Sequence, residues 1–159
     1  MRLALILGVI GFIVLCILMG KERVHLYMSK DGPKLEMTDA NGKLRTMLGG
    51  DKDGPALMLY DEKGIGRAFL AALPDSPELI LFDANEKGRA SLVVDKKGPS
   101  LTLADEAAVV RTVLYVSKRG PSVCLADENG NLRASLQVLK DGPVISLSGP
   151  DGKDLKQIR

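Results

Sequence analysis

The sequence offers few side chains that could act in catalysis or bind a metal. It has one histidine, His25, and two cysteines, Cys16 and Cys124, and none of them has a partner at the spacing of a metal site. The glycine-rich stretch from Gly49 to Gly54 lacks the Lys-Ser/Thr ending of a phosphate-binding loop. We therefore expect a protein that is not an enzyme and that carries no metal and no cofactor.

Aspartate and arginine recur instead at a fixed interval of 22 residues. The aspartates are Asp39, Asp61, Asp83, Asp105 and Asp127, and the arginines are Arg23, Arg45, Arg67, Arg89, Arg111 and Arg133. Such rows could hold a glycan, an anion or, through loops such as DANG, calcium. The simpler interpretation is that each Asp organises a turn and pairs with an Arg that opens the next strand. We favour this interpretation and keep the ligand-binding strip as the alternative.

The same interval governs the whole chain after its first 20 residues. Prolines occupy equivalent positions in six copies, namely Pro33, Pro55, Pro77, Pro99, Pro121 and Pro143. The consensus is D-G-P-x-L-x-L-x-D-x-x-G-x-x-R-A-x-L-x-V-x-x, and the last copy departs from it most. We assign residues 21–159 to one six-copy repeat domain.

Each copy contains two turn signals, of the types DENG and DKDG, with about five or six residues between them. Asp or Ser can start a type I turn, and Gly can supply the left-handed residue of a bulge, so both connections reverse the chain. This predicts an all-β antiparallel meander of about a dozen strands. A parallel β-helix with one coil per repeat is the alternative, but it would stack Asp on Asp and Arg on Arg.

Alternation along the strands predicts which residues share a face. In the second copy Leu57 and Leu59 face the same way as Ala68 and Leu70, and the other copies repeat the pattern. A flat sheet would leave this stripe in water. We therefore expect the sheet to curl into a barrel-like or spiral shell, or to bury the stripe on another chain.

The other face is specialised locally. It is apolar in the second and third copies, where we predict a partner interface made of Met58, Tyr60, Phe69, Ile80, Phe82 and Val93. In the fifth copy the same face carries polar or small residues such as Ser122 and Ser135. The alternative is a two-sided sheet that the curl of its own chain covers.

The N-terminus reads as a membrane anchor. Residues Leu3 to Met19 are 17 uncharged positions, which as a helix would be about 25 Å long. No small-x-small cleavage site precedes Lys21, so we predict one uncleaved transmembrane helix over residues 1–20 that enters the lipid bilayer through residues 3–19.

The repeat resembles a class of bacterial tandem repeats of the form D-G-P-x-L-x-L-x-D-x-x-G-x-x-R-A-x-L that often follow a signal or anchor segment. The stretch YDEKG, Tyr60 to Gly64, also resembles the core of the YD or Rhs repeats, whose hairpins build curved β shells. The resemblance implies a β architecture and an envelope setting, with the repeat domain on the periplasmic or extracellular side.

These expectations combine into one functional hypothesis. The net charge is only +2 and no block of like charge occurs, so nothing points to a nucleic-acid partner. We expect a single-pass membrane protein that acts as a non-enzymatic structural or accessory subunit and docks a partner protein, a membrane complex or its own copies. The alternative is a surface module that binds a glycan, an anion or calcium on the Arg and Asp rows.

Overall fold

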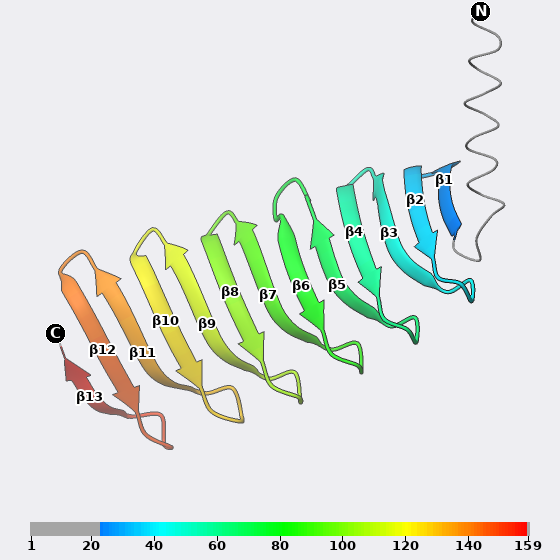
Figure 1. Cartoon of the computed structure of the whole chain (residues 1–159). Helices are drawn as coiled ribbons and strands as arrows, with labels where there is room; N and C mark the ends of the chain where they lie inside the picture. The colour runs from blue at the N-terminus through cyan, green and yellow to red at the C-terminus, as the bar shows by residue number, and fades with distance from the viewer. Residues whose placement is uncertain (1–22, 159) are drawn as a thin grey trace, which may run out of the picture.

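The computed structural model describes residues 23–158, apart from the side chain of Asp154, as one antiparallel sheet of 13 strands (Figure 1). The strands are β1 (Arg23–Ser29), β2 (Gly32–Thr38), β3 (Leu44–Asp51), β4 (Gly54–Tyr60), β5 (Gly66–Ala71), β6 (Glu78–Phe82), β7 (Gly88–Asp95), β8 (Gly98–Ala104), β9 (Val110–Ser117), β10 (Gly120–Ala126), β11 (Leu132–Leu139), β12 (Gly142–Ser148) and β13 (Asp154–Ile158). The anchor predicted over residues 1–20 lies outside the described residues. Within residues 23–158, no helix has the length and apolar character needed to span a membrane.

Each strand pairs with its neighbours in sequence, and every pairing is antiparallel. The predicted all-β meander is therefore confirmed. The parallel β-helix is wrong for the described residues, because a hairpin connection reverses the chain whereas a coil must bring it back in the same direction.

The Asp-led turns form as the sequence predicts. In the turn between β4 and β5, the N–H of Gly64 donates to the carbonyl of Asp61 at 3.0 Å, and Asp61 Oδ1 accepts from the backbone N–H groups of Lys63 and Ile65 at 2.9 and 3.1 Å. Gly64 has a φ of 84°. Next to this turn, the pairing of β4 with β5 shifts register between Leu59 and Tyr60. The carboxylate thus replaces the backbone partners that the turn removes.

The Gly-Pro turns differ from this expectation. Gly54 has a φ of 131°, and no register shift is found where β3 pairs with β4. A Cβ on Gly54 would lie 2.5 Å from the carbonyl oxygen of Ala72 on the far side of β4. The N–H of Ala72 donates to the carbonyl of Pro55 at 2.9 Å. Pro55 has no N–H of its own, so it cannot donate a hydrogen bond back to Ala72. Glycine is needed here because a neighbouring carbonyl occupies the space of its side chain.

The leucines share one face, as alternation predicts. We call this the leucine face, and its central row contributes one directly paired residue from each strand. The row is Leu26, Leu35, Leu48, Leu57, Leu70, Leu79, Leu92, Leu101, Leu114, Val123, Leu136, Ile145 and Ile158.

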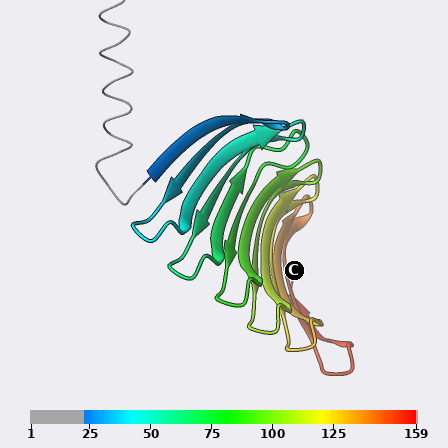
Figure 2. The same cartoon turned by 90° about the vertical axis from the view of Figure 1, so that its right-hand side faces the viewer.

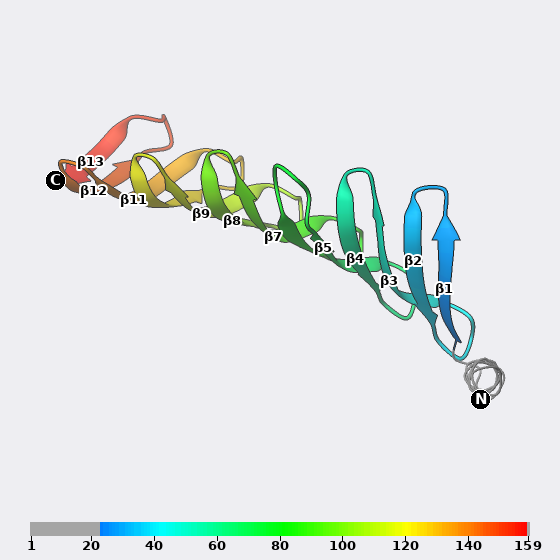
Figure 3. The ribbon, with the colours of Figure 1, turned by 90° about the horizontal axis from the view of Figure 1, so that it is seen from above.

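The expected closure into a barrel-like or spiral shell does not occur. The sheet bows along its strands and twists along its length, but β1 and β13 remain separate edges (Figures 2 and 3). Closing a barrel would require β1 to pair with β13, and these two strands have no such pairing.

The leucine face is consequently open. Leu70 is 51% exposed and Leu92 is 48% exposed, and the only buried apolar residues among those described are Ala71 and Val144. The side chains of the opposite face are the more enclosed: Ser122 and Ser135 are each 6% exposed.

Candidate functional site

The structure brings three of the six predicted interface residues into one row on the opposite face. Met58 on β4 pairs with Phe69 on β5, and Phe69 pairs with Ile80 on β6. Met47 on β3 pairs with Met58 and extends the row by one strand. Directly paired side chains lie about 4.5 to 5.5 Å apart at Cβ, so these four form a continuous apolar strip. We call Met47, Met58, Phe69 and Ile80 the apolar patch.

Val93 lies beside this patch rather than in it. It occupies the next row of the same face, where it pairs with Glu78, and Glu78 pairs with Ala71. Ala71 is 1% exposed, so small residues form the floor between larger side chains in this part of the face.

Tyr60 and Phe82 lie at the strand ends, past the bulges, and each faces a glycine. Tyr60 pairs with Gly66 and Phe82 pairs with Gly88. The equivalent pairs in other copies reverse the sizes, as in Ala126 with Leu132. One large and one small side chain share this position in these copies, so packing within the hairpin accounts for the two aromatic rings.

None of the six predicted residues is fully exposed. All of them are half-buried, although no other part of the described chain covers the sheet. Their neighbours on adjacent strands shield them instead. The face that the sequence marked as the outer one is thus the more protected of the two.

The C-terminal half of the same face is polar and hollowed. One groove of about 420 Å³ is lined by Ser135, Gln137, Ser146 and Gln157 among others. The row of the apolar patch continues through β7 and β8 as Ser91 and Thr102, so the change from apolar to polar takes place between β6 and β7. The patch therefore has a sharp boundary on this side.

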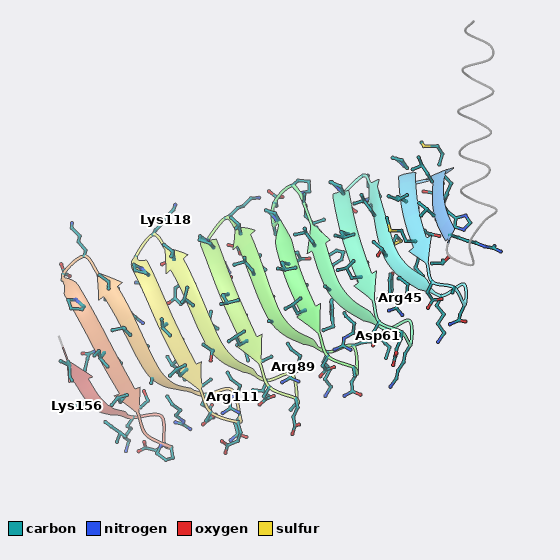
Figure 4. All side chains as sticks on the ribbon, in the orientation of Figure 1. Arg45, Asp61, Arg89, Arg111, Lys118 and Lys156 are labelled. Carbon is teal, nitrogen blue, oxygen red and sulfur yellow. The ribbon has the colours of Figure 1, made fainter. Side chains whose placement is uncertain are left out.

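The arginines and aspartates form a series beside the Asp-led turns, at one end of the strands, where Figure 4 shows Arg45, Asp61, Arg89 and Arg111. Arg111 Nη1 donates to Asp105 Oδ2 at 3.0 Å, and its Nε donates to the carbonyl of Ala126 in the next copy at 2.9 Å. Arg67 and Arg89 make the same two contacts in their own copies. In these three copies the arginine pairs with the aspartate of its own turn, as the simpler interpretation predicts, and it also ties that turn to the following one.

These contacts stabilise the ionised form of the aspartates. The hydrogen bond from the Arg111 side chain lowers the pKa of Asp105 below its usual value, and backbone N–H donors of the turn act in the same direction. Partial burial raises the pKa of Asp127, but the backbone N–H of Asn131 and the side chain of Arg133 outweigh it, so the pKa of Asp127 is about 2. The turn and the arginine together thus stabilise the negative charge of the aspartate.

No group of three or more His, Cys, Asp or Glu within residues 23–158 is arranged to hold a metal ion. His25 is exposed on β1 and pairs with Glu36. Cys124 is a free thiol in the polar half of the opposite face, next to Val113 and Ser135.

Sequence reasoning missed two features of the site. One is Met47, which could have been found by aligning β3 against β4 through their shared turn. The other is a hollow of about 430 Å³ on the leucine face, lined almost entirely by apolar side chains such as Leu57, Leu70 and Leu79. It lies next to the connection from Ala72 to Pro77, where the third copy lacks the Gly-Pro turn.

Comparisons with protein-family models and with curated proteins find no match to this chain.

Proposed function

We propose that this chain is a non-enzymatic, membrane-anchored accessory subunit that docks a partner protein through the apolar patch of the opposite face. The observation that carries the proposal is the row Met58, Phe69 and Ile80. Three large apolar side chains stand together on an open sheet, and the equivalent positions in the next hairpin are Ser91 and Thr102. A repeat that needed this row only for folding would have no reason to change it between copies.

The size and composition of the patch suit the centre of an interface. Methionine and aromatic residues are enriched at such centres, where flexible and flat side chains can follow the shape of a partner. The polar side chains directly beside it, Ser91 and Thr102, would form the rim. The anchor over residues 1–20 and the position on the periplasmic or extracellular side belong to the same proposal, and they would place the partner at the membrane.

The alternative, a surface module that binds a glycan, an anion or calcium, is less well supported. The arginines that would contact an anion already donate to an aspartate and to a backbone carbonyl of the next copy. The aspartates that would bind calcium already accept two backbone hydrogen bonds and face an arginine. Binding a ligand there would require breaking the contacts that join consecutive turns.

The test compares two variants of the same row. Phe69→Ser removes the middle of the patch, whereas Val113→Ser removes an apolar residue of the same row on β9. The whole chain is purified from its native membrane and the proteins that accompany it are quantified by mass spectrometry. We expect Phe69→Ser to reduce one partner by at least about tenfold, the usual effect of removing an interface anchor, and Val113→Ser to leave it unchanged.

Circular dichroism of both variants checks that the sheet is intact. Retention of every accompanying protein by a folded Phe69→Ser variant would refute the proposal, and so would equal losses in the two variants.

A further inference from the structure

The leucine face carries an apolar strip that runs the whole length of the sheet. With 13 strands about 4.8 Å apart, the central row is about 58 Å long. A row of prolines and small or apolar residues flanks it on one side, and on the other side lies a row that contains one charged residue, Lys156 on the edge strand β13. Three rows spaced two residues apart are about 14 Å wide, so the strip covers about 800 Å².

This area is what one partner of a stable interface contributes, about 800 Å². The partner must also be as long as the sheet, because the exposed leucines extend from β1 to β12. A compact globular protein would cover only part of such a strip, whereas a second copy of this chain carries a strip of the same length.

The flanking row that contains Lys156 gives a second reason to expect another copy of this chain as the partner. From β4 to β12 it alternates large and small side chains, in the order Leu59, Ala68, Leu81, Ala90, Leu103, Thr112, Leu125, Ala134 and Leu147. The large side chains therefore recur about every 9.6 Å, two strand spacings. A second copy offset by one strand presents its small residues opposite these large ones, so the surface is complementary to itself.

From these observations we infer that the leucine face is the contact surface between two copies of this chain, which pack face to face as a two-layer sheet. The contact is of the two-fold type, in which the same surface serves both copies. Because β7 is the middle strand of 13, its central residue Leu92 lies near the two-fold axis. The apolar patch lies on the opposite face and stays free for another partner.

The first test is chemical cross-linking of the whole chain in a background without cysteine (C16S and C124S). Leu92→Cys is compared with Ser91→Cys, its neighbour on the opposite face, using a bismaleimide that spans about 10 Å, the distance between packed sheets. We expect Leu92→Cys to give at least about fivefold more cross-linked dimer than Ser91→Cys, because only the first thiol faces the other sheet. Equal yields would overturn the inference.

The second test is the mass of the purified protein by light scattering, which also separates this contact from one made by the anchor. We expect a dimer for the natural chain and for Ser91→Lys, and a monomer for Leu92→Lys, which places a charge in the middle of the strip. A natural chain that is monomeric, or a Leu92→Lys variant that is still dimeric, would overturn the inference. Neither result bears on the apolar patch.

Discussion

Replacing Gly120 by alanine should destabilise the sheet more than replacing Gly142, which has a comparable conformation. Gly120 has a φ of 127°, and a Cβ there would collide with the carbonyl oxygen of Val138. That oxygen belongs to the backbone of β11, so it cannot move away without disturbing the pairing of β10 with β11. The substitution therefore adds a steric cost to a conformational one.

The two costs can be separated with Gly142. Its φ of 123° is nearly the same, yet nothing lies within 4 Å of a Cβ placed on it. The conformational cost is about 1–3 kcal/mol in both variants, and the collision adds about 1–3 kcal/mol in Gly120→Ala alone. Gly120→Ala should thus lower the free energy of unfolding by about 2–6 kcal/mol, and Gly142→Ala by about 1–3 kcal/mol.

The assay is urea unfolding of the whole chain in detergent, followed by circular dichroism. Because Gly142 lies in the last copy, Gly64→Ala serves as a second control, in a turn nearer the middle of the chain. Gly64 has a φ of 84° with nothing within 4 Å of its Cβ position, and this variant should lose about 1–2 kcal/mol. Equal losses in Gly120→Ala and Gly142→Ala would refute the argument that a carbonyl fills the space of the glycine side chain.

Three further predictions concern the turns and their charges. Ala108 has a φ of 65° where most copies have glycine, so Ala108→Gly should raise the free energy of unfolding by about 0.5 kcal/mol in the same assay; a loss of stability would contradict this. Arg111→Lys cannot keep both contacts of the guanidinium and should lose about 1 kcal/mol, whereas Arg45, which is 3.8 Å from its aspartate, should tolerate lysine; the reverse order would be inconsistent with the contacts. The pKa of Asp127 is lowered from 3.8 to about 2 in the folded chain, so between these pH values the unfolded chain binds more protons than the folded chain does. Stability is therefore lost on acidification, and the urea midpoint should fall as the pH drops from about 4 to 2. Asp127→Asn should weaken this dependence, and an unchanged midpoint in both proteins would argue against it.

The fold was largely predictable because most copies of the repeat carry the same alternation of apolar residues and the same turn residues. Alternation placed Leu57 and Leu70 on one face, and the register of β4 with β5 confirms it. The turn chemistry of Asp61 and Gly64 was equally readable, since a carboxylate and a left-handed residue satisfy the turn within a few residues. Local signals of this kind do not depend on the rest of the molecule.

The global shape was not predictable in the same way. Whether a sheet closes depends on the stagger accumulated across all its strands, and no single copy contains that quantity. The role of Gly54 was also hidden, because the carbonyl that requires it belongs to Ala72, which directly follows β5. Met47 was missed for a related reason, since it joins the patch only through the pairing of β3 with β4.

The most direct test of the proposed docking is hydroxyl-radical labelling of the whole chain, in its native membrane and after purification followed by a wash that removes the accompanying proteins. If a partner covers the apolar patch, the labelling of Met58 and Phe69 should rise on purification, while that of Tyr115, on the polar half of the same face, should stay constant. Leu92 should be weakly labelled in both states, because the second copy remains bound. Equal labelling of Met58 and Phe69 before and after purification would contradict the account.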